Sequence, residues 1–393
     1  MPSADPSPPP SREVGPRLRV RTRKDYSVPF LVDAGQRNAT FVRRKWTPLR
    51  NLVQWADAFA ILPEPDFDIV HAVNAVPILT RRPYVLTFED YLPRTPEDRY
   101  VGWLERALQR ALLSDRCVGL VAISEYALRQ FRWQARAFAG REALEAKLQL
   151  LYPAIAPRRA QPKRGFGGDG VRLAFVAHDF LHKGGPALLD AHEALRAAGV
   201  PVRTTVVSTL RWAPDGYIGP PDAAYAQAQH ARLATTPGVT HHLGLPNDEA
   251  LKTMAEADFL VFPTLHDTFG YVSLEAMAAG TPVLATATCA QPEVVEHGVG
   301  GFLLDLDNED RLGRWAWSYR TAEPGYMDAY RATMASLGDQ ITAHVASVWE
   351  AGPGRYRELS AGALARVHDR FGQERMRVAL EQLYEQCRAY RVR

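Results

Sequence analysis

The stretch HDTFGYVSLEAMAAGTPVLATATCAQPEVVEHGVGGFLL, residues 266–304, decides the fold that we predict for this chain. The apolar run before it, residues 258–263, stops at a proline and is typical of a buried parallel strand. A polar turn containing Gly270 follows, and then a run of good helix formers that ends at Gly280. The stretch therefore predicts a strand, a tight loop and a helix whose first turn lies above the end of the strand.

Two acidic residues flank this loop, Asp267 within it and Glu275 in the helix that follows. Unpaired N–H groups at the start of a helix suit a phosphate. A carboxylate has two acceptor oxygens and can bind two neighbouring hydroxyls of a sugar or a ribose. Together these features indicate a nucleotide-sugar site. For an isolated pair of acids the alternative is structural, with Asp267 capping the turn and Glu275 exposed early in the helix.

The same stretch resembles the donor site of retaining glycosyltransferases of family 4. That family has an acidic residue, a Phe-Gly pair, four residues and a Glu, and then a helix that ends in Ala-Met-Ala-x-Gly-x-Pro. The residues that fit this pattern are Phe269, Gly270, Glu275, Ala276, Met277, Ala278, Gly280, Pro282, Val283, Pro292, Glu293, Gly298, Gly301 and Phe302. This chain departs from the pattern at Asp267, where the family has Glu, and at Ala290-Gln291, where the family has Gly-Gly.

The resemblance extends to the loop of residues 178–185. There the family has Gly-Arg and, five residues after the Arg, Lys-Gly, and both basic side chains hold the donor diphosphate. Lys183 and the glycine after it match, whereas His178 takes the place of the Arg. A lysine brings a compact charge to a phosphate oxygen, while a histidine is charged only if the phosphate raises its pKa. In the first half, Glu89 stands where many relatives have a His that faces the donor sugar.

Composition and length are those of an ordinary globular protein with room for two domains. The chain has 393 residues, of which 46% are hydrophobic and 23% are charged. It contains no apolar run of about 18 residues, and its first 15 residues have no apolar core like that of a secretory signal. Cys117, Cys289 and Cys387 are scattered and lack the spacing of metal ligands. We therefore expect a cytoplasmic protein with reduced thiols.

Charge is distributed unevenly along the chain. Residues 1–165 carry 27 basic and 17 acidic side chains, and the remainder carries 20 and 27. The net charge is thus +10 in the first part and −7 in the second. One interpretation is a solvated basic face, and the other is a surface for an anionic acceptor or for peripheral contact with an anionic membrane. Nucleic acid is not expected, because no recognition helix or aromatic RNA-binding motif accompanies the charge.

Strands and helices alternate along both halves, which predicts doubly wound parallel sheets. The expected strands of the first half are residues 26–32, 68–73, 83–88, 117–123 and 148–152, and its helices are 97–113 and 124–138. The second half is expected to have strands at 171–177, 203–207 and 239–242 besides those of the opening stretch. Because only one strand is expected before residue 68, the first domain is predicted to be short of crossover units.

Three further motifs have structural interpretations. Residues 165–170 form a formal G-x-G-x-x-G, but they precede a strand, so we expect a flexible hinge between domains and no dinucleotide site. The D-x-D pairs at 66–68 and 305–307 align with turns of the family, so no metal site is expected. Trp315, Trp317 and Tyr319 are expected in the core, with a ligand platform as the alternative.

The resemblance implies a GT-B fold, in which two Rossmann-like domains face each other across a cleft and C-terminal helices cross back. The predicted parts are a disordered tail 1–17, an acceptor-side domain 18–160, a linker 161–170, a donor domain 171–370 and a returning helix 371–393. The implied function is transfer of a sugar, expected to be a hexose, from a nucleotide-diphosphate donor to an acceptor hydroxyl, with retention of configuration, without a metal or another cofactor. UDP- or GDP-sugars are the expected donors. A glycan, a lipid-linked glycan or a small molecule is the expected acceptor, within polysaccharide biosynthesis.

The resemblance also assigns roles to residues of this chain. Asp267 contacts hydroxyls of the donor sugar, and Lys183 with the helix start stabilises the departing diphosphate. Glu89 completes the catalytic set. The expected donor-binding residues are Glu275 on the ribose, Phe269, Gly270 and Tyr271 through backbone amides, and Thr268, Lys183 and His178. Two alternatives stay open: a catalytically inactive nucleotide-sugar-binding partner subunit, and an epimerase or phosphorylase on the same fold.

Overall fold

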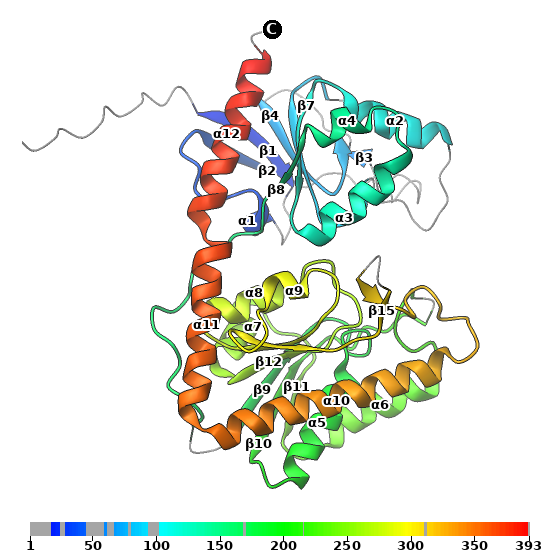
Figure 1. Ribbon diagram of the computed structural model, residues 1–393, viewed down its shortest axis with the longest axis vertical. Coiled ribbons are helices and arrows are strands. Elements are labelled where there is room, and N and C mark those ends of the chain that lie inside the picture. Colours follow the sequence, from blue (N-terminus) through cyan, green and yellow to red (C-terminus); the bar gives the residue numbers. More distant parts are fainter. Residues whose placement is uncertain are drawn as a thin grey trace, which may run out of the picture.

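The computed structural model describes residues 17–23, 28–44, 59–60, 67–77, 80–92, 102–167, 170–214, 216–309 and 313–391. These residues form two α/β domains, each built on a six-stranded sheet whose strands all run parallel. Two long C-terminal helices run along one side of both domains (Figure 1). This architecture confirms the predicted fold class. The tail predicted to be disordered lies, apart from Arg17, outside the described residues.

The first sheet has the strand order β2-β1-β4-β6-β7-β8. Its strands are β1 (Leu18–Arg23), β2 (Ala39–Arg44), β4 (Ile69–Val73), β6 (Tyr84–Phe88), β7 (Cys117–Ala122) and β8 (Leu148–Leu150). The helices are α1 (Val28–Leu31), α2 (Gly102–Leu113), α3 (Glu125–Gln134) and α4 (Arg141–Glu145), and β3 (Phe59–Ala60) pairs with β5 (Val76–Pro77). Ser124 caps α3 by accepting a hydrogen bond from the Ala127 N–H at 2.9 Å.

The strand predicted at residues 26–32 is wrong, because Val28–Leu31 is the short helix α1. Instead the chain has two strands before residue 68, β1 and β2, which pair in parallel. In β1 Leu18, Val20 and Thr22 are buried and Arg19 is exposed, but Arg21 is buried as well, so the burial of this strand does not simply alternate. The arginines made this segment resemble a basic surface. The first domain is therefore not short of strands.

The second sheet has the order β11-β10-β9-β12-β13-β14. Its strands are β9 (Val171–Val176), β10 (Val202–Val207), β11 (Val239–His242), β12 (Phe259–Phe262), β13 (Val283–Thr286) and β14 (Gly301–Leu304). Its helices are α5 (Gly185–Ala197), α6 (Ala223–Thr235), α7 (Asn247–Glu256), α8 (Tyr271–Ala278) and α9 (Gln291–Val294). The short strands β15 (Asn308–Glu309) and β16 (Arg314–Trp315) pair with each other in antiparallel fashion. The strand order reverses between β9 and β12, and in such sheets ligands bind at the carboxyl ends of the strands at this point.

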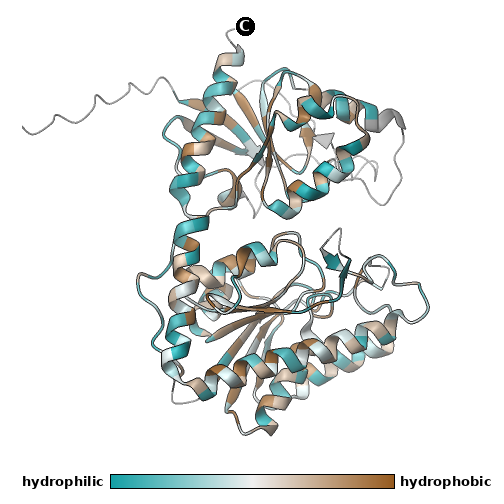
Figure 2. Ribbon diagram, in the orientation of Figure 1, coloured by the Kyte–Doolittle hydropathy of each residue, from teal (hydrophilic) through white to brown (hydrophobic). Residues whose placement is uncertain are grey.

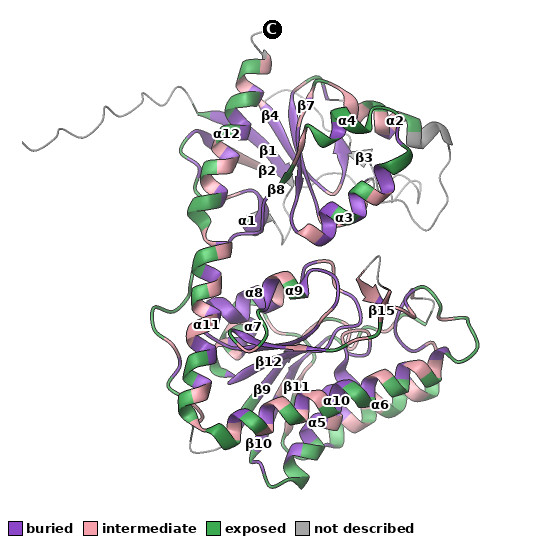
Figure 3. Ribbon diagram, viewed as in Figure 1, coloured by how far each residue is buried: buried purple, intermediate pink, exposed green. Residues whose placement is uncertain are grey.

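Apolar residues concentrate in the central strands of both sheets, and the helices turn polar faces outward (Figures 2 and 3). In the second domain β12 is buried along its whole length, as the apolar run 258–263 predicts. Trp315 is buried in the core, whereas Tyr319 is 46% exposed. The prediction of a core position is therefore confirmed for Trp315 and wrong for Tyr319.

The linker between the domains packs on the second domain. The Phe166 ring lies 4.9 Å from that of Tyr356 and 5.3 Å from that of Trp349, measured between centroids. The buried Lys163 donates to the Thr281 hydroxyl at 2.6 Å. The prediction of a flexible hinge is therefore wrong at Lys163 and Phe166 of the linker, because the second domain holds both side chains.

The last three helices join the two domains. They are α10 (Tyr326–Ala351), α11 (Pro353–Phe371) and α12 (Gln373–Arg391), and α12 leaves the second domain to cover the first sheet (Figure 1). Its buried side chains cluster with those of the sheet: Met376, Leu380, Leu383, Tyr384 and Cys387 with Leu18, Val20, Ile69, Val85 and Val121. A Cβ atom added to Gly119 would meet Leu383 at 2.9 Å, so this glycine lets the helix approach the sheet. The predicted return of the C-terminal helix is confirmed.

The two domains also meet where the carboxylate of Glu293 in α9 contacts the start of α3. Both carboxylate oxygens of Glu293 accept hydrogen bonds at 2.7 Å from the first N–H groups of α3, those of Glu125 and Tyr126. The Tyr152 hydroxyl donates to the same carboxylate at 2.9 Å, and Arg370 in turn donates to Tyr152. A carboxylate at a helix N-terminus is favourable because it meets both the unpaired N–H groups and the helix dipole. Glu293 therefore ties the second domain to the first.

His71 links α12 to the first sheet, and its burial makes the stability of the protein depend on pH. Its two ring nitrogens lie 2.8 Å from the hydroxyls of Tyr384 and Thr87, and burial lowers the pKa of His71 to about 3. Between pH 6.5 and 3 the unfolded chain binds a proton here that the folded chain does not, so the unfolding free energy falls as the pH falls. From pH 7 to 4.5 this loss is expected to be about 2 to 3 kcal/mol.

Urea unfolding of wild type and His71→Asn at both pH values measures this difference. The variant is expected to lose less stability than wild type over the same pH interval, whatever its stability at pH 7. His368→Asn, at a histidine with an 80% exposed side chain, is the control and should keep the wild-type slope. Equal slopes for wild type and His71→Asn would contradict the prediction.

Candidate functional site

A cavity of about 940 Å³ lies at the carboxyl ends of β9 and β12, where the strand order of the second sheet reverses. The loop after β9 leads into α5, and the loop after β12 leads into α8. Loops that follow β10 and β11 contribute the remaining walls. All described residues that line the cavity belong to the second domain.

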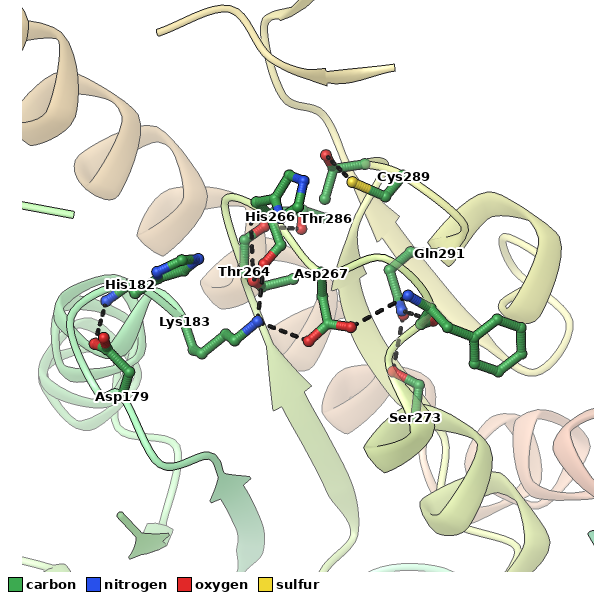
Figure 4. A network of polar contacts seen from close by, with 12 residues as sticks. Asp179, His182, Lys183, Thr264, His266, Asp267, Ser273, Thr286, Cys289 and Gln291 are labelled. Carbon is green, nitrogen blue, oxygen red and sulfur yellow. Dashed lines mark hydrogen bonds and ion pairs between the residues drawn. The ribbon is translucent and has the colours of Figure 1, made fainter. Parts of the chain in front are cut away.

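Gly184 brings the two central loops together. Its φ of +83° is unfavourable for other residues, and an added Cβ atom would lie 2.0 Å from the Pro263 carbonyl oxygen. This close approach places the Lys183 ammonium 2.7 Å from a carboxylate oxygen of Asp267 and 2.8 Å from the His266 carbonyl oxygen (Figure 4). The Lys-Gly pair thus positions a cation directly against the acid of the other loop.

The ion pair sets the charge state of the site. Burial raises the pKa of the Asp267 carboxyl, but the Lys183 ammonium and the hydrogen bond from it outweigh burial, so this pKa lies below its ordinary value. Burial holds the pKa of the neighbouring His182 well below its usual range, and the Lys183 charge lowers it further. Burial raises the pKa of Asp179, which accepts a hydrogen bond from the His182 N–H at 2.9 Å. His182 is therefore neutral and Asp267 is ionised at neutral pH.

The start of α8 is held by Gln291. The Gln291 side chain donates to the Phe269 carbonyl oxygen at 2.6 Å and accepts from the Ser273 hydroxyl at 2.8 Å (Figure 4). Gly270 precedes the helix with a φ of +78°, and an added Cβ atom would lie 1.9 Å from the Gln291 amide nitrogen. The departure from the family pattern at residue 291 thus has a structural role, because this side chain fixes the loop that carries Asp267.

Six of the predicted site residues line the cavity together. They are His178, Lys183, Asp267, Gly270, Tyr271 and Glu275. Glu275 is buried in the middle of α8 with only 4% exposure, which differs from the structural alternative of an exposed acid. Phe269 lies in the core, and its N–H faces the Asp267 carboxylate at 3.3 Å. Thr268 is half-buried and is not among the described lining residues.

Glu89 lies in the first domain and reaches the site from the other side. Its carboxylate accepts a hydrogen bond from the Tyr271 hydroxyl at 3.1 Å, and its N–H donates to the Asn74 side chain at 3.1 Å. The Tyr271 ring also packs on Phe30 of the first domain, with 5.0 Å between centroids. The first residue of α8 is therefore a contact point between this loop of the second domain and the first domain.

The cavity contains residues that sequence analysis did not single out. Arg211 and Tyr217 come from the loop after β10, and Asn247 comes from the start of α7. Tyr217 places its hydroxyl 3.3 Å from the His266 ring and stacks on Tyr319, with centroids 4.8 Å apart. Polar residues just beyond the carboxyl end of a parallel strand are the available signal, and β10 is followed at once by such a segment.

Two features are absent from the described residues. No group of three or more His, Cys, Asp or Glu side chains among them is arranged to hold a metal ion. Within the same residues no helix combines the length and the apolar character needed to cross a bilayer. Asp66 of the first D-x-D pair lies outside the described residues.

Two parallel-sheet domains, joined by a returning C-terminal helix and carrying a polar cavity at the strand ends of the second sheet, define a protein of the GT-B class. Residues 158–314 match the family of glycosyl transferases group 1. Over these residues the chain is similar to glycosyltransferases of this family.

Relatives and solved structures agree with this placement. A D-inositol 3-phosphate glycosyltransferase of Streptomyces griseus is 31% identical over 183 residues, which cover 45% of this chain and 35% of the relative. The chain spans about half or less of the length of the curated relatives that it matches.

Among solved structures, HepE of Anabaena in complex with UDP-glucose has a TM-score of 0.58 at 15% identity, covering 95% of this chain and 100% of that one. Sucrose-phosphate synthase from Thermosynechococcus elongatus has a TM-score of 0.56 at 16% identity, covering 96% and 90%. At such identities the likeness concerns the fold.

Proposed function

We propose that the protein transfers a sugar, with retention of configuration, from a nucleoside-diphosphate donor to an acceptor hydroxyl. The observation that carries this proposal is that Lys183, Asp267 and Glu275, from three separate places in the second domain, line one cavity at the reversal of the strand order. UDP-glucose in the structural neighbour HepE supports a nucleotide sugar as the ligand class. Retention and independence of a metal rest on the family resemblance of residues 266–304.

In this proposal the two acids bind hydroxyls and the cation binds phosphate. The buried Glu275 carboxylate accepts both hydroxyls of the ribose. Asp267 accepts from the hydroxyls of the donor sugar, and Lys183 exchanges part of its contact with Asp267 for a phosphate oxygen. The N–H groups at the start of α8 face the same phosphates. Charge that grows on the departing diphosphate is thus met by a preorganised cation and by the positive end of a helix.

Glu89 is the proposed residue of the acceptor-side domain in the reaction. Its carboxylate is held by Tyr271, the first residue of α8, at 3.1 Å. A carboxylate at this place can accept a proton from the acceptor hydroxyl or a hydrogen bond from the donor sugar. Either role requires the two domains to be close together, and the contacts of Glu293 with α3 keep them so.

A panel of UDP-, GDP- and ADP-sugars tests the proposal on the wild-type chain. Binding is measured by thermal shift and calorimetry, and turnover is measured as release of the nucleoside diphosphate. We expect one donor to raise the melting temperature and to be consumed slowly by hydrolysis or faster with a mixture of sugar and glycan acceptors. A hexose is the expected sugar.

Two other outcomes decide against this function in different ways. Tight binding of a donor without release under any acceptor mixture would identify a nucleotide-sugar-binding partner subunit that has lost the reaction. No binding of any nucleotide sugar would remove the assignment of the cavity as a donor site.

A further inference from the structure

The acidic side chains that line the cavity outnumber its lysine and arginine side chains. Three acids face it, Asp179, Asp267 and Glu275. Lys183 is already paired with Asp267 at 2.7 Å, and His182 is held neutral by burial. A diphosphate that enters such a cavity meets electrostatic repulsion unless a cation is free to receive it. The lining residue able to do so is Arg211.

Arg211 lies on the loop after β10 and is fastened to the loop after β9. Its backbone N–H donates to the His178 carbonyl oxygen at 3.1 Å. The same oxygen accepts from the Ser208 hydroxyl at 3.1 Å and from the Thr209 hydroxyl at 2.9 Å. Three donors from one short segment thus converge on a single carbonyl, so the segment is held beside His178.

Leu210, immediately before the arginine, has a φ of +53°. This left-handed conformation is uncommon for a leucine and persists only where the surroundings enforce it. The Leu210 N–H donates to the Ser208 hydroxyl at 3.2 Å, which closes the turn. The strained turn at Leu210 directs residue 211 back toward the cavity. Backbone strain of this kind is commonly found at functional sites.

The Arg211 side chain is exposed and makes no ion pair with the carboxylates that the structure describes. The Arg211 charge nevertheless acts on the site. Burial raises the pKa of the Asp179 carboxyl, and the charges of Lys183 and Arg211 both oppose that rise. Lys183 and Arg211 thus present two cations to one cavity from the neighbouring strands β9 and β10.

We propose that Arg211 is a diphosphate-binding residue of this cavity. Its guanidinium forms paired hydrogen bonds with phosphoryl oxygens of a nucleoside diphosphate, while Lys183 supplies a point charge to the same group. This inference rests on the proposed function and adds to it a second cation for the diphosphate, beside Lys183. In this chain the second cation, Arg211, comes from the loop after β10. His178 stands at the end of β9, where the family pattern has an arginine.

The test compares ligands with and without phosphates. Binding of UDP, GDP, uridine and guanosine is measured by calorimetry on wild type, Arg211→Ala and Arg211→Lys. Arg211→Ala is expected to weaken binding of the preferred nucleoside diphosphate by about 10- to 100-fold and to leave the nucleoside unchanged. Arg211→Lys is expected to lie between the two, because it keeps the charge and loses the planar fork.

Matched variants separate charge from structure. Arg357→Ala removes an exposed arginine of α11 and should bind like wild type. Thr209→Val removes one of the three donors to the His178 carbonyl and should weaken the diphosphate by a few-fold only, again without affecting the nucleoside.

Two results would overturn the inference. One is wild-type affinity of Arg211→Ala for the diphosphate, and the other is an equal loss of diphosphate and nucleoside affinity, which would make Arg211 a residue that shapes the cavity. If wild type itself binds no nucleoside diphosphate, the proposed function fails, and that result is distinct from both.

Discussion

Replacing Lys183 by alanine is expected to lower kcat with the preferred donor by about 100- to 1,000-fold, the range found when one preorganised charge donor to a reacting group is removed. The loss has two sources. The departing diphosphate loses its cation, and Asp267, whose carboxylate oxygen lies 2.7 Å from the Lys183 ammonium, is left in a half-buried site without its partner. Nucleoside diphosphate release under saturating donor measures the effect.

Two further variants define what is lost. Lys183→Arg keeps a cation and is expected to recover part of kcat, although its longer fork alters the geometry at Asp267. Lys252→Ala removes a lysine of α7 whose side chain is 73% exposed and should not change kcat. A loss of less than tenfold in a folded Lys183→Ala protein would show that this lysine is not the group that stabilises the leaving diphosphate.

Replacing Glu275 by alanine is expected to weaken binding of the nucleoside diphosphate by about 100-fold or more. The carboxylate is buried to 4% exposure in α8, so its two oxygens form hydrogen bonds with little competition from water. Each charge-assisted hydrogen bond contributes about 1.5 to 3 kcal/mol, and two to the ribose account for the expected loss. Calorimetry with the preferred nucleoside diphosphate measures it.

A deoxy analogue makes this prediction specific to the ribose. Wild type should prefer UDP or GDP over the corresponding 2′-deoxy compound, and Glu275→Gln should lose most of that preference while it keeps the shape of the side chain. Glu256→Ala, at an acid of α7 with a 63% exposed side chain, is the control. A preference for the ribose that survives in Glu275→Gln would place the carboxylate elsewhere in the reaction.

The sequence pattern around residue 270 predicted the core of the site because the constraints there are local. An apolar strand, a glycine with positive φ and a helix ended by Gly280 can be recognised within one short stretch, and they place Asp267 and Glu275 on one side of a sheet. The match of Lys183 followed by glycine also had a local signal. The structural reason for that glycine is long-range, however, because it makes room for the Pro263 carbonyl.

The parts that were missed depend on contacts between distant segments. Every second residue of strand β1 is an arginine, and only the pairing of this strand with β2 and β4 distinguishes it from a basic surface. Arg211 joins the site because its loop is tied to His178, thirty-odd residues earlier in the chain. The role of Gln291 depends on hydrogen bonds to residues 269 and 273. Of these relations only the polar segment after β10 leaves a pattern in the neighbouring sequence, and that pattern does not single out Arg211.

The packing of α12 on the first sheet affects how the chain can mature during translation. The side chains that cover Val20, Ile69 and Val85 belong to residues 376–387, which the ribosome makes only after the whole second domain. Domains generally fold in the order of synthesis, and exposed apolar surface on a waiting intermediate promotes aggregation. The first domain is therefore made early and closed late. Its sheet exposes apolar surface until α12 is made, and a fragment that stops before residue 373 is expected to expose the same surface permanently.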